Sequence, residues 1–290
     1  MTIGESGRGD SKKYDFLARL QEVEGLINDD SDNYGEKKKE YVNKRLVELE
    51  AGTSPRQLSA FSKDCVGFIH PKSEVKRVMY CDGFCLDDGG VYEELIDNIK
   101  LFKKQPGYSE LSTRAISLPA LQWTIERYFG NQLSSNDTNN RNKSFYSDHS
   151  SVDSEPVSMK KELKGTGMAM CAEKAALAQN LLTFLGMQTE LVISSKCNLG
   201  GQDNENHAYN LVTTEKGSFV YDPTNPRIFT NEKGELVGTQ AALYPIGAED
   251  YQRLKDGGTV ETEHKDMTVG ADGNKNLSDK AQKRIYGYSG

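Results

Sequence analysis

Residues 171–187 read CAEKAALAQNLLTFLGM, and this stretch decides how the second half of the chain is expected to fold. Alanine, leucine, glutamate, lysine and glutamine favour helices, and a glycine after the last apolar residue is a common stop signal. We therefore expect a helix that begins near Cys171 and ends at Gly186. Its inward face has helical spacing and places the thiol in the first turn: Cys171, Ala175, Ala178, Leu182 and Leu185.

Two alternating stretches follow the helix. Residues 206–212 (NHAYNLV) and 218–222 (SFVYD) predict two strands, with a turn at 214–217 between them. If the loop holds an even number of residues, antiparallel pairing puts His207 and Asp222 on one face, because their numbers add up to an odd value. The two are then direct or diagonal neighbours, within reach of a hydrogen bond. Pro223 is expected to end the second strand.

These residues suit nucleophilic catalysis. A helix N-terminus lowers the pKa of a thiol and presents free N–H groups to an oxyanion. Each residue alone has an ordinary structural explanation: a buried cysteine, a histidine in a strand, an aspartate before a proline. In this order they form a triad in which Cys171 is the nucleophile, His207 the base and Asp222 the group that orients the histidine.

The segments CAEKAALAQNLLTFLGM, NHAYNLV and FVYDPTNP resemble the three motifs of the transglutaminase-like superfamily, which belongs to the papain-like group. The resemblance covers about residues 160–230, at most to His264, and matches Cys171, His207 and Asp222 to the family triad. It implies a helix packed on an antiparallel sheet. The family often has glycine two residues before the cysteine, where this chain has Ala169. An upstream side chain usually completes the oxyanion hole, and the nearest candidates are Gln122 and Trp123.

The resemblance implies acyl transfer from a protein or peptide amide through a thioester. Water as acceptor gives peptidase, amidase or glutamine deamidase activity, and an amine acceptor gives cross-linking. We favour hydrolysis because nothing in the sequence marks an amine site. Two alternatives remain open: a catalytically silent fold that serves as a protein-binding module, and acetyl transfer of the arylamine N-acetyltransferase kind, although the RGGxC motif of that group is missing.

The chain as a whole is expected to be an α+β protein. Helical periodicity marks residues 14–50, with a polar break, and 91–104, and a helix is expected from Pro119 to Phe129. A strand at 242–246, a short helix at 248–254 and a weak strand at 259–264 come later. The regions are a disordered tail (1–13), a mostly helical region (14–130), a polar linker or loop (131–157), the catalytic module (158–265) and a polar C-terminal tail (266–290).

Charge and composition exclude several classes of function. The net charge of −7 argues against a general affinity for nucleic acid or anionic membranes. No stretch approaches the roughly 18 apolar residues of a membrane span, and the N-terminus lacks the apolar core of a signal peptide. We expect a cytoplasmic protein, or one exported without a cleavable signal. Its partner would be a protein or peptide substrate, and its oligomeric state is unknown.

Neither a metal nor a cofactor is expected. The five cysteines favour free thiols over a disulfide framework. A zinc site at Cys65, His70, Cys81 and Cys85 lacks the tight CxxC pairs that structural zinc prefers. The aspartates at 82, 87 and 88 lack the alternating positions of an EF-hand. Residues 200–203 are expected to form a flexible loop beside the site, between a strand that ends near Ile193 and His207, with Cys197 incidental at its start.

Overall fold

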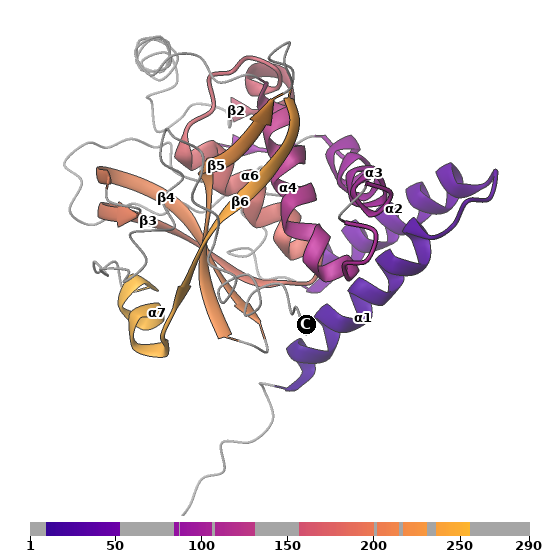
Figure 1. Cartoon of the computed structure of the whole chain (residues 1–290), viewed down its shortest axis with the longest axis horizontal. Helices are drawn as coiled ribbons and strands as arrows, with labels where there is room; N and C mark the ends of the chain where they lie inside the picture. The colour runs from indigo at the N-terminus through magenta and orange to yellow at the C-terminus, as the bar shows by residue number, and fades with distance from the viewer. Residues whose placement is uncertain are drawn as a thin grey trace, which may run out of the picture.

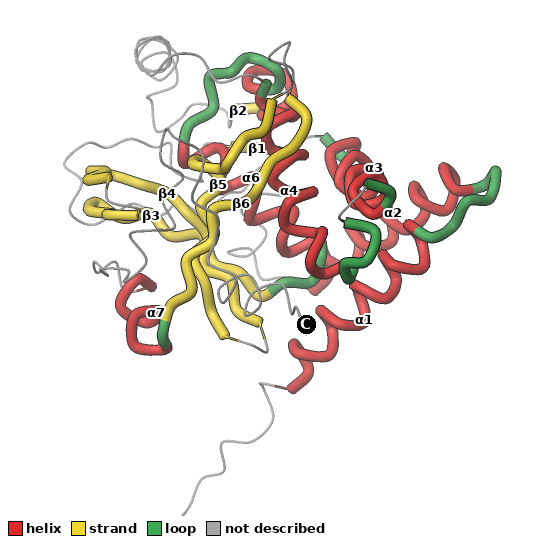
Figure 2. Tube along the Cα trace, in the orientation of Figure 1, coloured by secondary structure: helices red, strands yellow, loops and turns green. Residues whose placement is uncertain are grey.

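The computed structural model describes residues 10–52, 84–86, 88–105, 108–130, 157–199, 202–214, 217–230 and 236–255. Helices of the N-terminal half lie beside an antiparallel sheet, so the protein is of the α+β class (Figures 1 and 2). Several predictions fall outside the described residues and stay predictions: most of the N-terminal tail, the linker at 131–156, the strand at 259–264 and the C-terminal tail.

The described part of the N-terminal region holds four helices: α1 (Asp10–Ile27), α2 (Tyr34–Gly52), α3 (Gly90–Lys103) and α4 (Thr113–Phe129). The polar break predicted after the first apolar run is the connection between α1 and α2. Helix α1 begins inside the stretch that was expected to be a tail. The predicted helix at 91–104 agrees with α3 to within one residue at each end.

Helix α4 begins six residues before the predicted start at Pro119, so that prediction was wrong. Ser112 is the N-cap, and its hydroxyl accepts a hydrogen bond from the amide of Ala115 at 3.2 Å. A serine cap is a stronger start signal than the proline, which here lies inside the helix and removes one backbone bond. Burial of Ile116, Leu118 and Leu121 around it offsets that loss.

Four strands form one antiparallel sheet in sequence order: β3 (Gln188–Leu199), β4 (Gln202–Thr214), β5 (Gly217–Thr230) and β6 (Leu236–Ile246). Two short strands, β1 (Phe84–Cys85) and β2 (Val157–Ser158), pair in parallel, and β2 leads into the π-helical turn η1 (Met159–Leu163). The strand predicted at 242–246 is the end of β6.

All four strands of this sheet extend beyond their predicted bounds. Strand β5 continues past Pro223 to Thr230, with a register shift against β6 between Asp222 and Arg227. The irregularity accommodates a residue that has no amide hydrogen for the ladder. Strand β3 runs to Leu199 and pairs with β4 from Gln202 onward. The expected loop from Ile193 to His207 is therefore mostly a hairpin.

Helix α6 (Cys171–Phe184) and helix α7 (Ala248–Lys255) lie on opposite faces of the sheet. The Thr189 hydroxyl donates to the side chain of Gln179 on α6, whereas the adjacent Glu190 accepts from Tyr251 on α7. Neighbouring residues of a strand point to opposite faces, which separates the two helices. Gly186 follows α6 with φ of +81°, as the predicted glycine stop requires.

One continuous hydrophobic core joins the helical half to the sheet. It contains side chains from α1, α2, α3, α4, α6 and strands β4 to β6: Leu20, Val42, Val91, Ile116, Leu177, Tyr209, Val220 and Tyr244. Helix α6 contacts the sheet as well as α2, α3 and α4, and α4 also packs directly on β6 (Figure 1). The N-terminal helices are thus packed against the sheet region and not merely tethered to it.

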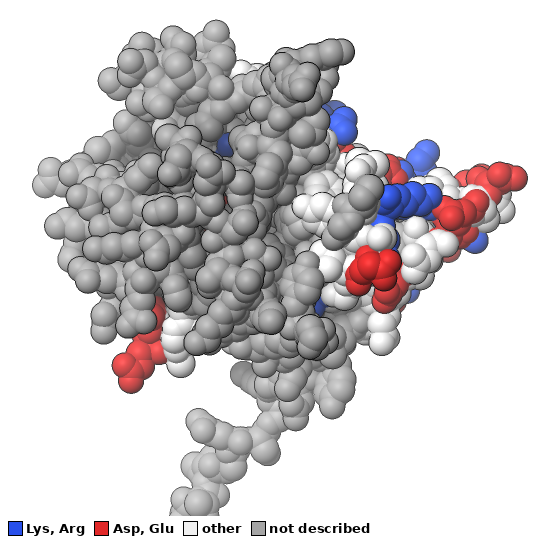
Figure 3. Space-filling model, in the orientation of Figure 1, with Lys and Arg blue, Asp and Glu red and all other residues white. Residues whose placement is uncertain are grey.

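Charged residues cover the outer side of α1, α2 and α3. Figure 3 shows basic and acidic side chains side by side on this face. Lys38 on α2 pairs with Asp97 on α3 at 2.6 Å, and Lys37 pairs with Asp29 at the same distance. Exposed pairs of this kind contribute little to stability. Within the described residues, none of the helices combines the length and hydropathy that a membrane crossing requires.

Candidate active site

Cys171 is the first residue of α6 and is half-buried. Met170 precedes it in an extended conformation, and the backbone amide of Met170 donates to Glu173 Oε2 at 2.9 Å. This is half of a capping box, a common device for starting a helix. The thiol is therefore at the end of the helix where unpaired N–H groups and the positive end of the helix dipole lie.

The loop before Cys171 is anchored to the C-terminal end of α4. The amides of Gly165 and Gly167 donate to the carbonyl oxygens of Tyr128 and Phe129 at 2.8 and 2.7 Å. Gly165 and Gly167 have φ of +73° and +68°, values that side chains other than glycine rarely adopt. The glycines satisfy carbonyls at the end of one helix while they direct the chain into the next.

Small side chains bring the start of α6 close to strand β4. Ala172, Ala175 and Ala208 form a buried cluster, against which Cys171 and Leu191 pack. One turn further along, Asn210 Nδ2 donates to the Ala175 carbonyl at 3.1 Å. Cys171 thus lies at the level of Ala208, the residue directly after His207.

The structure places the backbone of His207 in β4, opposite Ser194 of β3, while its side chain lies outside the described part of the chain. The pairing of β4 with β5 runs from Asn210 opposite Tyr221 to Thr214 opposite Gly217. The residue numbers of each pair add up to an odd value, as predicted. Continued by one residue, this register puts Asp222 on the face of His207, as its diagonal neighbour.

The same register has a second consequence for the triad. Asn210 bonds to α6, so in a regular pleat Ala208 also faces α6, and His207 and Asp222 face the other side of the sheet. The imidazole can approach the thiol only if the first part of β4 rotates away from regular alternation. The structure therefore brings the backbone around His207 to Cys171, but it does not describe a contact between the two side chains.

Asp222 has no exposed surface, and its Oδ1 accepts a hydrogen bond from the amide of Thr224 at 2.9 Å. The residues on either side of it both bond to Gln122 of α4. The hydroxyl of Tyr221 donates to Gln122 Oε1, and Gln122 Nε2 donates to the Pro223 carbonyl at 3.0 Å. A fully buried carboxylate in a strand is thus held by its neighbours as well as by its own side chain.

Gln122 was a candidate for the oxyanion hole, and the geometry argues against that role. Its Nε2 donates to Pro223 and also to Glu126 Oε1 at 3.0 Å, which occupies both amide hydrogens. Trp123, the second candidate, packs its ring against Phe102 of α3. Gln122 is therefore not available to an oxyanion at the thiol. Trp123 Nε1 has no hydrogen-bond partner among the described residues, but its ring packs toward α3. The backbone amides at the start of α6 are the donors closest to the thiol in sequence.

Three buried ionisable groups beside the site were missed by sequence reasoning. Lys174, 2% exposed, pairs with Glu126 of α4, 7% exposed, at 3.1 Å. Glu173 is 1% exposed; burial raises the pKa of its carboxyl group to about 7, and Oε1 has no hydrogen-bond partner among the described residues. The available signal was two charged residues in a helix whose other early positions are alanine and leucine.

The metal candidates are only partly described. Asp88 pairs with Lys164 at 2.8 Å and accepts from the amide of Gly90 at 3.2 Å, which is an ordinary ion pair and turn contact. Among the described residues, no three histidine, cysteine or acidic side chains are grouped as metal ligands would be. Cys65, His70 and Cys81 lie outside those residues, so the zinc hypothesis is not tested.

The fold and site together define an α+β protein with a half-buried thiol at the start of a helix that packs on an antiparallel sheet. The chain matches no protein-family model, no curated protein and no solved structure. The transglutaminase-like resemblance therefore rests on the three sequence motifs, and function has to be argued from the residues themselves.

Proposed function

We propose that this protein is a thiol-dependent hydrolase or acyltransferase that acts on amide bonds of proteins or peptides, as a peptidase, amidase or glutamine deamidase. The observation that carries the proposal is the position of Cys171. It occupies the first residue of α6 and packs against the cluster that contains Ala208, next to His207. In this proposal the region from residue 158 to 265 is a papain-like, transglutaminase-like catalytic module.

In the proposed reaction, the thiolate of Cys171 attacks the amide carbonyl carbon, and a carbon–sulfur bond forms. The oxyanion is stabilised by backbone N–H groups at the start of α6. His207, protonated by the thiol, donates that proton to the leaving nitrogen as the carbon–nitrogen bond breaks. Water then loses a proton to His207 and attacks the thioester, which releases the acid and regenerates the thiol. Asp222 orients the imidazole throughout.

A binding module without turnover is the second candidate, and one observation favours it. The β4 side chain in contact with the cluster at Cys171 is Ala208, and regular alternation directs His207 to the other face. If β4 keeps that geometry in solution, His207 does not lie within reach of the thiol. The two candidates therefore differ in whether the reactivity of Cys171 depends on His207.

The deciding experiment is the rate of Cys171 alkylation by iodoacetamide against pH, measured by mass spectrometry. The wild type, His207→Ala and the control His149→Ala are compared, with Cys197 as an internal reference. We expect Cys171 to react well below the usual thiol pKa of about 8.5, and only His207→Ala to remove this advantage. A Cys171 that reacts no faster than Cys197 in the wild type supports the binding module instead.

A second assay distinguishes the possible acyl acceptors, water and a primary amine. A peptide that contains glutamine is incubated with the protein, with and without a labelled primary amine. Release of ammonia with a glutamate product indicates deamidation, a cleaved backbone indicates peptidase activity, and incorporation of the label indicates transamidation. Cys171→Ala provides the blank, because it removes the nucleophile while a small side chain remains in the alanine cluster.

A further inference from the structure

A chain of buried polar side chains connects helix α6 to strand β5 through helix α4. It starts at Lys174, whose Nζ lies 3.1 Å from Glu126 Oε1. The same oxygen accepts from Gln122 Nε2 at 3.0 Å, and Gln122 in turn bonds to the carbonyl of Pro223 and the hydroxyl of Tyr221. We use the term α4 network for Gln122, Glu126 and Lys174.

The two ends of the α4 network lie next to two of the proposed catalytic residues. Lys174 is three residues after Cys171 in the first turn of α6, so the two positions are neighbours on the helix surface. At the other end, Tyr221 and Pro223 are the residues immediately before and after Asp222. The network thus joins the helix turn that carries the thiol to both neighbours of the carboxylate.

Backbone pairing is weakest where the network contacts β5. The regular register with β6 stops at Asp222 and resumes, shifted, at Arg227. The pairing with β4 extends only to Tyr221. Strand β5 therefore lacks continuous ladder bonds just beyond Asp222, and the bond from Gln122 to the Pro223 carbonyl supplies an anchor at that point.

The composition of the network favours a positioning role over a stabilising one. Lys174 and Glu126 are almost completely buried, and removing two charges from water costs about as much as their attraction returns. An apolar pair of similar volume would often be as stable. What the charged pair adds is a directed contact, since Glu126 has to stay in place to accept from both Lys174 and Gln122.

We propose that the α4 network is a set of positioning residues that holds Asp222, through its neighbours, in a fixed relation to Cys171. This inference has a mechanical part, that the network holds β5 in place, and a catalytic part, that this placement supports the triad. Only the catalytic part rests on the proposed function. None of the three residues touches substrate in this proposal. Without the network, the segment of β5 around Pro223 is expected to open more often, with the sheet otherwise intact.

Hydrogen–deuterium exchange tests the mechanical part. The variant is Gln122→Met, which keeps the volume but removes the bonds to β5. The matched control is Thr124→Val on the same helix, which breaks a buried bond to Asn98 of α3 at 2.9 Å and leaves β5 alone. We expect exchange at the amide of Thr224 to rise about tenfold in Gln122→Met and not in Thr124→Val. Equal exchange in both variants overturns the inference.

A milder variant covers the case in which Gln122→Met does not fold. Tyr221→Phe removes only the hydroxyl that bonds to Gln122 and keeps the buried ring. We expect it to raise exchange at Thr224 in the same direction by a smaller factor. No rise in this variant, measured at the same global stability as the wild type, also contradicts the proposal.

The pH profile of Cys171 alkylation tests the catalytic part. Gln122→Met is expected to move the midpoint of the profile toward the usual thiol value, whereas Thr124→Val leaves it in place. A purely structural role predicts no movement in either. If the wild type lacks histidine-dependent reactivity, the proposed function fails, and the exchange experiment still decides whether the network positions β5.

Discussion

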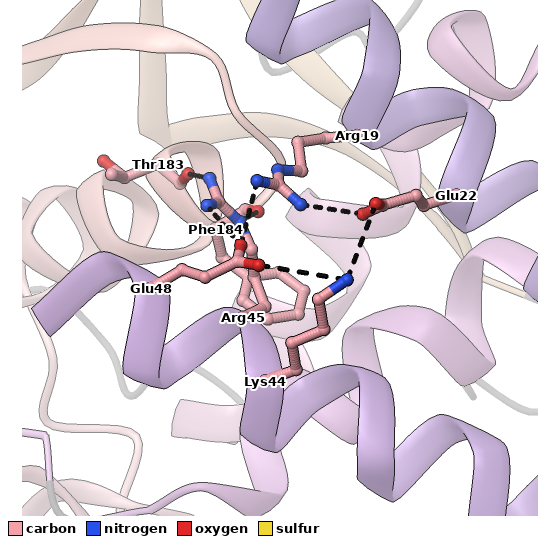
Figure 4. A network of polar contacts seen from close by, with 7 residues as sticks. All are labelled: Arg19, Glu22, Lys44, Arg45, Glu48, Thr183 and Phe184. Carbon is pink, nitrogen blue, oxygen red and sulfur yellow. Dashed lines mark hydrogen bonds and ion pairs between the residues drawn. The ribbon is translucent and has the colours of Figure 1, made fainter. Parts of the chain in front are cut away.

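Nε of Arg45 on α2 lies 3.0 Å from the carbonyl oxygen of Phe184 at the C-terminal end of α6. Its Nη2 donates to the carbonyl of Thr183 at 3.2 Å, and Glu48 approaches its Nη1 at 3.4 Å (Figure 4). A buried cation therefore holds the negative end of the helix that carries Cys171 at its positive end. The N-terminal helices thereby contribute to the placement of the candidate site.

The first prediction concerns this arginine. Arg45→Met should lower the free energy of unfolding by about 2–3 kcal/mol, because two buried carbonyl groups lose charged donors. Urea denaturation measures the change. Lys44→Met changes the neighbouring, exposed residue, which pairs with Glu22 and Glu48, and should change stability by less than about 0.5 kcal/mol. Equal losses of stability in the two variants would mean that the contacts of Arg45 with α6 contribute no more than those of the exposed Lys44.

The second prediction concerns the pH dependence of stability. Burial raises the pKa of the Glu173 carboxyl group from 4.5 to about 7. As pH rises, Glu173 loses its proton at a lower pH in the unfolded chain than in the folded protein. The free energy of unfolding therefore falls as pH rises from about 4.5 to about 7. Glu173→Gln keeps an acceptor for the Met170 amide and removes the ionisation. The melting temperature of Glu173→Gln, relative to that of the wild type, should therefore rise between pH 4.5 and pH 8.

The control for this prediction is Glu36→Gln, at an exposed position in the first turn of α2. Its difference from the wild type should not grow between the two pH values. A constant difference for Glu173→Gln as well would show that this carboxyl group does not keep a raised pKa in the folded protein. Calorimetry at a series of pH values gives both curves.

The third prediction concerns the buried ion pair. Lys174→Met leaves Glu126 without its cation and should cost about 3–5 kcal/mol. The double variant Lys174→Met/Glu126→Leu should recover most of that loss, because both charges are gone. A double-mutant cycle in urea measures the coupling between the two sites. Additive losses would show that the two residues act independently.

The fourth prediction concerns the loop that leads to Cys171. Gly130 has φ of +84°, and a Cβ atom there would lie 3.1 Å from the backbone of Gly165. Gly130→Ala should therefore lower stability by more than about 1 kcal/mol, from strain and from displacement of the loop. Gly25→Ala in α1, where nothing lies within 4 Å, should instead raise stability by about 0.5–1 kcal/mol. Thermal melts of both variants check the opposite signs.

Local sequence signals predicted much of the fold. The helical spacing before residue 105, the strong helix after Cys171 and the alternation of 206–222 all led to elements that the structure contains. Two errors were at prolines, and others were the tail in which α1 begins and the loop that is mostly the β3–β4 hairpin. Pro119 lies inside α4 and Pro223 inside β5, because burial of the surrounding residues outweighs one missing backbone bond in each.

Sequence by itself determined which elements form around the candidate site, because helix propensity, glycine stops and strand alternation act between near neighbours. It also determined the parity of the hairpin that places His207 and Asp222 on one face. Tertiary structure alone decided that Lys174 meets Glu126, that Gln122 binds β5, and that Arg45 binds the end of α6. Those contacts join residues from 48 to 139 positions apart, and only the packing of α2, α4, α6 and β5 brings them together.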